Sequence, residues 1–116
     1  MLPFLTLVIV TAASAASAAA PAGPPPYQDT LRCAAYSQAA AELSRDPVTG
    51  VPESKTFDHA MFWSFAVMDA ARRAGIASAE AEAAQKVERA KVKPALASGD
   101  PAATDALQAC LDLAPR

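Results

Sequence analysis

The chain of 116 residues is long enough for one domain. Its 10 basic and 12 acidic side chains give a formal net charge of −2, which argues against DNA or RNA as a partner, because nucleic-acid-binding proteins carry a strongly basic surface. The hydrophobic fraction of 53% overstates the core that the chain can build, because much of it is alanine and part of it lies in the apolar leader.

The leader, residues 1–20, predicts a signal peptide. An apolar stretch over residues 2–10 is followed over residues 11–20 by alanine, serine and one threonine, and this order is typical of an export signal with a small-residue cleavage region. Residues 16–18 and 18–20 both fit the A-x-A cleavage pattern. The alternative is an uncleaved membrane anchor, because the apolar run approaches the length of a membrane span. The rest of the chain is therefore expected in the periplasm or the extracellular medium.

The two cysteines, Cys33 and Cys110, are expected to form a structural disulfide. They are the only cysteines of the chain, and disulfides persist in the compartments to which exported proteins go. They lie too far apart for a C-x-x-C redox motif, and with His59 as the only histidine they make a poor zinc site. Two buried free thiols are the alternative. No cofactor and no metal are expected.

Two helices are predicted in the first half of the mature chain, after a proline-rich arm at residues 21–26. The first helix is expected over residues 27–45, and the prolines and glycine of residues 46–52 then break the chain. Its predicted inner face consists of Cys33, Tyr36, Ala40 and Leu43. The second helix is expected over residues 56–74, with Thr56 as its N-cap and Gly75 as its end. Its predicted core face is Phe57, Met61, Ser64, Phe65 and Met68, extended by Trp63, Val67, Ala70 and Ala74.

Two further helices are predicted in the second half. The third is expected over residues 79–93, with Ser78 as N-cap and with an end or a kink at Pro94. Its apolar stripe is Ala79, Ala83, Val87 and Ala90. The fourth starts at Asp100, an N-cap followed by Pro101 in the first helical position. Its apolar face is Ala103, Leu107, Cys110 and Ala114.

Four helices with mostly short connections predict an all-α fold for residues 27–116, a small up-down bundle, with a three-helix core and a packed C-terminal helix as the alternative. In the bundle the first and last helices are antiparallel neighbours. A helical rise of about 1.5 Å per residue then places Cys33 and Cys110 near the same end of the molecule. The topology and the disulfide therefore support each other.

Two surface regions are candidates for binding. The first, which we call the Phe62 patch, consists of Asp58, Phe62, Asp69 and Arg73. An aromatic ring surrounded by charges resembles the centre of a protein-binding surface, and the alternative is that the loop over residues 46–55 covers Phe62. The second is a basic surface of Lys86, Arg89 and Lys93. It suits an anionic lipid surface or an acidic partner, and the alternative is an ordinary solvated face.

No catalytic arrangement is predicted. His59 follows Asp58 directly, but adjacent helical residues point about 100° apart and no nucleophile is in register, so a solvated histidine is expected. The protein is therefore expected to be no enzyme. It is expected to be a protein-interaction module whose partner is another envelope protein, with no stable membrane insertion after cleavage.

The layout of a leader, a small helical domain and two distant cysteines resembles two classes of bacterial envelope protein. One comprises acid-stress periplasmic chaperones, and the other comprises periplasmic immunity proteins that neutralise cell-wall amidases. The resemblance implies two alternative functions, a stress-responsive chaperone or an inhibitor of a cell-wall enzyme. It covers architecture only and assigns no site residue. The alanine and proline content is typical of a high-GC bacterium.

Overall fold

The computed structural model describes residue 3 and residues 25–115. These residues form four α-helices and no strand. The helices are α1 (Tyr27–Leu43), α2 (Ser54–Arg73), α3 (Ser78–Ala97) and α4 (Pro101–Leu113). The predicted all-α fold is confirmed, and so is the disulfide between Cys33 and Cys110, whose Cα atoms lie 5.3 Å apart. The predicted signal peptide, apart from residue 3, and residues 21–24 of the predicted arm lie outside the described residues.

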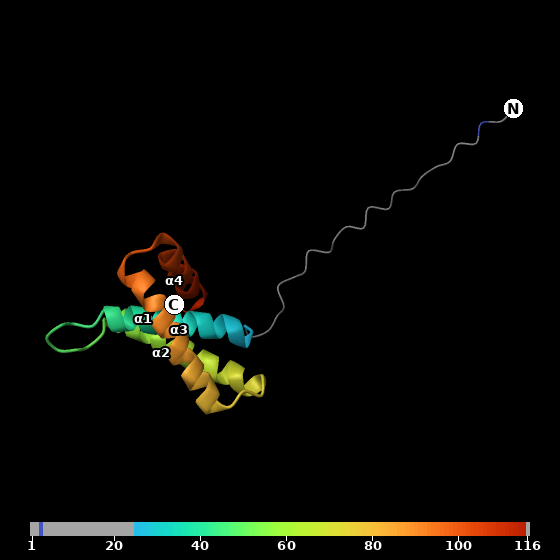
Figure 1. Ribbon diagram of the computed structural model, residues 1–116, viewed down its shortest axis with the longest axis horizontal. Helices are drawn as coiled ribbons and strands as arrows, with labels where there is room; N and C mark the ends of the chain where they lie inside the picture. The colour runs from blue at the N-terminus through green and yellow to red at the C-terminus, as the bar shows by residue number, and fades with distance from the viewer. Residues whose placement is uncertain (1–2, 4–24, 116) are drawn as a thin grey trace.

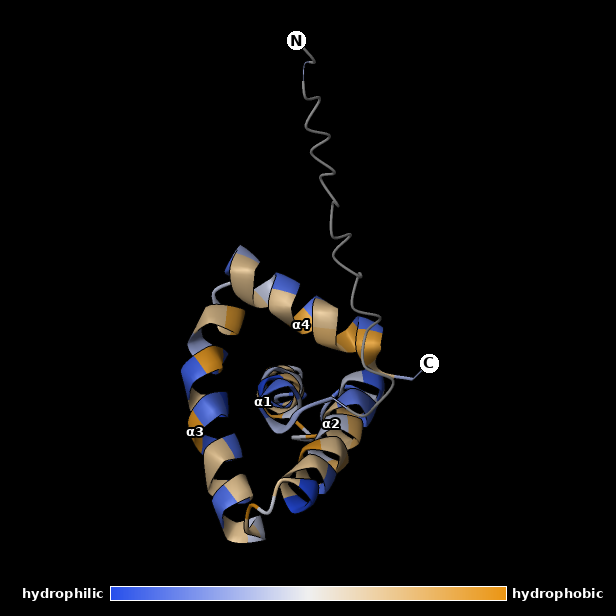
Figure 2. Ribbon diagram, turned by 90° about the vertical axis from the view of Figure 1, so that its right-hand side faces the viewer, coloured by the Kyte–Doolittle hydropathy of each residue, from blue (hydrophilic) through white to orange (hydrophobic). Residues whose placement is uncertain are grey.

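Helix α1 lies in the middle of the bundle, and the other three helices surround it (Figure 2). Its buried residues point in most directions around the helix and are mainly small: Thr30, Leu31, Cys33, Ala34, Ala35, Ser37, Ala39 and Ala41. The predicted single inner face is therefore wrong apart from Cys33, since Tyr36 and Ala40 are half-buried and Leu43 is exposed. A helix enclosed by neighbours needs small side chains all round rather than one stripe of large ones.

Helix α2 turns the predicted extension of its apolar face to the core, and not the predicted centre of that face. Its buried residues are Ala60, Trp63, Val67, Ala70 and Ala71. The core assignment of Trp63, Val67 and Ala70 is confirmed. Phe57, Met61 and Phe65, which were predicted at the centre of the face, are exposed. The alanines let α2 approach the similarly small residues of α1 closely. Close approach of two helices thus decides the buried face here, in place of the size of the apolar residues.

The helix ends follow their sequence signals in part. Gly75, with φ of +73°, ends α2, and the Ile76 N–H donates to the Ala71 carbonyl at 2.8 Å, as in a Schellman motif. The predicted start of α4 is confirmed, since the Asp100 carboxylate accepts from the Ala103 N–H at 3.0 Å and Pro101 follows it. The prediction of Thr56 as N-cap is wrong, because Thr56 is the third residue of α2. Its hydroxyl donates to the carboxylate of Glu53.

Helix α3 is longer than predicted and runs through Pro94 to Ala97. Ser78 is its first residue rather than its N-cap. Proline removes one backbone donor, and the helix tolerates this here because Pro94 and Ala90, whose carbonyl loses its partner, are both exposed. The predicted apolar stripe is wrong, because all four of its residues are exposed and the buried residues of α3 are Ala81 and Gln85.

The α1–α2 loop projects from the bundle (Figure 1).

Candidate interaction surface on helix α2

Four large apolar side chains lie exposed on the side of α2 that faces away from the core. Phe57 is 46% exposed, Met61 38%, Phe62 37% and Phe65 69%. We call these four residues the α2 outer face. Phe57, Met61 and Phe65 follow one another at intervals of four, so they form a line along the helix, and Phe62 lies beside that line. A helix of this length thus carries one apolar surface toward α1 and a second toward solvent.

The residues of the predicted Phe62 patch all lie on the exposed side of α2, next to this line. Asp69 pairs with Arg73 at 2.8 Å and also with Arg72, so its carboxylate is held beside the aromatic residues. Asp58 forms no ion pair with any residue that the structure describes. The Phe62 ring packs edge-on against Trp63, with ring centroids 5.1 Å apart. The exposed fraction of Phe62 shows that the loop before α2 does not bury it.

Exposure of four such side chains is not accounted for by the folding of this chain. Full burial of one phenylalanine or methionine side chain contributes about 1.5–3 kcal/mol, and the exposed part of these side chains leaves a share of that free energy unused. Contiguous apolar surface on a soluble domain marks a site for another molecule more often than an accident of folding. Sequence reasoning located Phe62 but assigned the other three residues to the core. The signal that could have found them is that α2 has more large apolar residues than one packed face requires.

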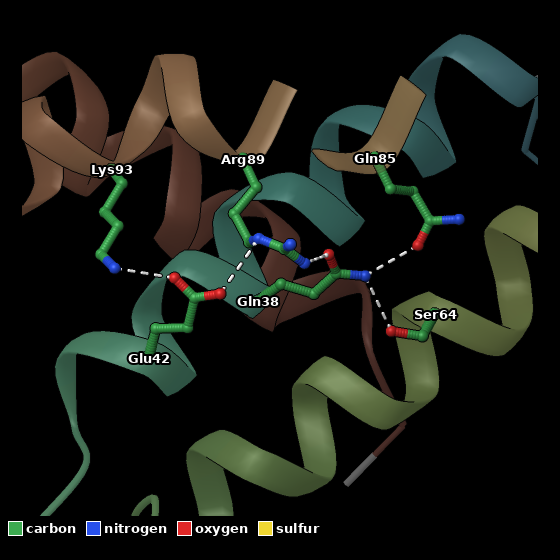
Figure 3. A network of polar contacts seen from close by, with 6 residues as sticks. All are labelled: Gln38, Glu42, Ser64, Gln85, Arg89 and Lys93. Carbon is green, nitrogen blue, oxygen red and sulfur yellow. Dashed lines mark hydrogen bonds and ion pairs between the residues drawn. The ribbon is translucent and has the colours of Figure 1, made fainter. Parts of the chain in front are cut away.

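The predicted basic surface is engaged with α1 rather than free. Figure 3 shows a network of six polar side chains that joins α1 to α2 and α3: Gln38, Glu42, Ser64, Gln85, Arg89 and Lys93. Glu42 pairs with Arg89 at 3.0 Å and with Lys93 at 2.8 Å (Figure 3). Of the three predicted cations, only Lys86 is exposed without an ion pair to a described residue. Two of the three charges therefore stabilise helix packing.

The side-chain amide of Gln38 lies at the centre of this network. The Gln38 amide nitrogen donates to the Ser64 hydroxyl at 2.9 Å and to the Gln85 side-chain oxygen at 2.8 Å. Its oxygen accepts from Arg89 at 2.9 Å (Figure 3). Because every polar atom of the Gln38 side chain has a partner, this half-buried network fixes α3 against α1 without leaving an unpaired group.

Replacing Glu42 with glutamine is expected to lower the free energy of unfolding by about 1–2 kcal/mol at neutral pH, since it leaves two cations without their partner. The hydrogen bond from Lys93 and the charge of Arg89 hold the pKa of Glu42 below its usual value of 4.5, against an opposing effect of burial. A carboxylate whose pKa is lower in the folded state than in the unfolded state stabilises the fold at pH values above its unfolded pKa. This contribution to stability is lost as the pH falls through its folded pKa. The difference in stability between the two proteins should therefore shrink between neutral pH and an acidic pH below 4.5.

Denaturant unfolding of both proteins at the two pH values measures this effect. Glu88→Gln is the matched control, because among the described residues Glu88 pairs only with Lys91, on the surface of α3, at 3.1 Å. This variant should lose less than about 0.5 kcal/mol. Equal losses for the two variants, or a Glu42→Gln deficit that persists in acid, would contradict the role assigned to Glu42.

The fold and this surface define a small helical protein that is cross-linked between its first and last helices and exposes an aromatic helix face. Comparison with known proteins finds no matching protein-family model, no similar curated protein and no matching solved structure. Among the residues that the structure describes, no helix has the length and apolar character needed to cross a membrane. The same residues contain no cluster of histidine, cysteine, aspartate and glutamate suited to a metal ion.

Proposed function

We propose that the protein is a non-enzymatic interaction module that binds a partner protein through the α2 outer face. The observation that carries the proposal is the exposure of three phenylalanines and a methionine together on one helix. Aromatic residues, methionine and arginine are the types enriched in protein interfaces. The adjoining Asp69–Arg73 pair supplies the polar rim that surrounds the apolar centre of such a surface.

The partner proposed is an envelope protein that offers an apolar groove or helix face. At a helical rise of about 1.5 Å per residue, the line from Phe57 to Phe65 spans about 12 Å, which suits anchors set into a groove at helical spacing. Asp58, with no ion pair to a described residue, favours a lysine or arginine at the edge of the partner's groove.

Export of the mature chain is part of the same proposal. It is supported by the order of the leader, residues 1–20, in which an apolar stretch precedes a small-residue region. The Cys33–Cys110 disulfide also fits an oxidising compartment, where such bonds persist. We propose the periplasm of a bacterium as that compartment, with the leader removed.

The test is recovery of the protein from the exported fraction after cross-linking in cells. Phe65→Asp places a charge at the most exposed aromatic and is expected to weaken partner capture at least about thirtyfold, the effect of losing one strong interface residue. Val87→Asp is the matched control, because Val87 is a 53% exposed apolar residue on α3. The control should capture the same partner as the native chain, and both variants should stay within about 0.5 kcal/mol of its stability.

The outcomes separate the parts of the proposal. Unchanged capture by Phe65→Asp would overturn the assignment of the α2 outer face. A recovered mass that still includes the apolar leader would overturn cleavage. Capture of many unfolded proteins in place of one partner would favour the chaperone alternative over a dedicated interaction module.

A further inference from the structure

Three exposed residues, Asp58, Phe65 and Arg72, lie on the same side of α2, because they follow one another at intervals of seven residues, which is about two helical turns. Phe65 is 69% exposed, and the Arg72 side chain is 80% exposed. An aromatic ring therefore lies midway between an acid and a base on the solvent-facing side of the helix. The two charges have opposite sign and lie at equal distances along the helix from Phe65.

This symmetric spacing is self-complementary when two α2 helices lie antiparallel. A two-fold axis through the two Phe65 side chains places Asp58 of each copy opposite Arg72 of the other. A parallel pair would place like charges opposite each other, which is unfavourable. Asp58 forms no ion pair with a described residue. Arg72 pairs with Asp69, but Asp69 also pairs with Arg73 at 2.8 Å, so Asp69 keeps a partner when Arg72 binds another chain.

A depression at the corner between α2 and α3 complements the first residue of the α2 outer face. It has a volume of about 510 Å³ and is lined by Met68, Asp69, Arg72, Ile76, Ala77 and Ser78. Phe57 lies on the same flank of α2 as Met68, because eleven residues are about three helical turns. A two-fold axis perpendicular to both helices sets each flank of α2 against the same flank of the other copy. In an antiparallel pair, the Phe57 ring of each copy therefore lies against this depression in the other.

We propose that the α2 outer face binds a second copy of this chain, with the two α2 helices packed antiparallel around Phe65. The inference rests on the proposed function and names the partner of the same surface. The α2 outer faces of both copies form the apolar centre, and two Asp58–Arg72 pairs flank it. The occupant is a second copy because one face supplies both the acid and the base, and lies next to both the Phe57 ring and the depression that receives it.

Sedimentation equilibrium of the disulfide-bonded protein measures this association, and a dimer is expected at micromolar concentrations. Phe65→Asp places two like charges at the axis and should weaken the association at least about thirtyfold. Asp58→Arg and Arg72→Asp should each weaken it about tenfold, because each variant sets like charges opposite each other. The double variant carries the same two charges in exchanged positions, so it should associate within about threefold of the native chain.

The matched control is Lys86→Glu, which reverses an exposed charge on α3 and should leave the association unchanged. A native chain that stays monomeric up to about 500 μM would overturn the inference, and so would a double variant as weak as its parents. Association that Phe65→Asp leaves unchanged would overturn the antiparallel interface. The cross-linked species tests the proposed function separately. If the native chain captures a different protein and Phe65→Asp loses it, the second copy is overturned as the partner while the interaction surface stands.

Discussion

Loss of the Cys33–Cys110 disulfide is expected to lower the free energy of unfolding by about 4.5 kcal/mol. The bond joins residues 77 positions apart, so it removes much of the freedom of the unfolded chain. It also ties the first helix of the bundle to the last. Small single domains are stable by only about 5–15 kcal/mol, so the reduced protein should lie near the limit of folding.

Denaturant unfolding of the oxidised and reduced protein measures this loss, followed by far-ultraviolet circular dichroism. The double variant Cys33→Ala with Cys110→Ala separates the cross-link from the effect of the reductant, since its midpoint should not respond to reduction. Both sulfurs are buried, so the double variant should be no more stable than the reduced chain. A loss below about 1 kcal/mol on reduction would show that helix packing alone holds the bundle together.

Replacing Trp63 with alanine is expected to cost about 3–5 kcal/mol, the usual range for emptying a large aromatic site in a core. Trp63 is only 3% exposed and belongs to the core cluster with Leu31, Val67 and the two cysteines. Most other buried side chains are alanines, so few neighbours can move in to fill the space. The variant should therefore combine lost apolar burial with a persistent cavity.

Thermal and denaturant unfolding of two further variants give the comparison. Trp63→Phe keeps an aromatic ring and removes an indole N–H that has no hydrogen-bond partner within the described residues, so it should lose only about 1–2 kcal/mol. Phe62→Ala removes the neighbouring but exposed ring and should cost less than about 1.5 kcal/mol, mostly its edge-on contact with Trp63. A Phe62→Ala loss as large as that of Trp63→Ala would contradict the assignment of the core.

The parts of the fold that sequence reasoning predicted are those fixed by local chemistry. Asp100 with Pro101 and Gly75 mark helix boundaries because capping and a positive φ depend on a few adjacent residues. The disulfide followed from the cysteine count and the predicted topology. The predicted end of the third helix at Pro94 is wrong, because the cost of one missing backbone bond depends on the tertiary surroundings of the helix.

The faces that pack together were harder to predict, because they depend on how closely two helices approach. In α2 the buried face contains Ala60 and Ala71, which were not predicted there, whereas Phe57 and Phe65 remain outside. Hydrophobic periodicity ranks phenylalanine above alanine and so centres the predicted face on the phenylalanines, although its extension over Trp63, Val67 and Ala70 is buried. The outer face was therefore assigned to the core, and only Phe62 was recognised as a surface residue.

The basic surface was predicted to be free for a partner, and this prediction failed for a related reason. The pairing of Arg89 and Lys93 with Glu42 joins residues far apart in the sequence. Charge counting along a single helix cannot find such a partner, since it depends on which side of α1 meets α3.

The central position of α1 also has a consequence for the order of assembly. Of the four helices, α1 is synthesised first, and it is the one that the other three enclose. Its buried side chains are mostly small, so α1 alone has too little apolar surface to form a core. Burial of Cys33 and its pairing with Cys110 need the final turns of the chain. The native contacts of this protein are therefore completed only after synthesis of its C-terminal residues, so an interrupted chain has no finished hydrophobic interior.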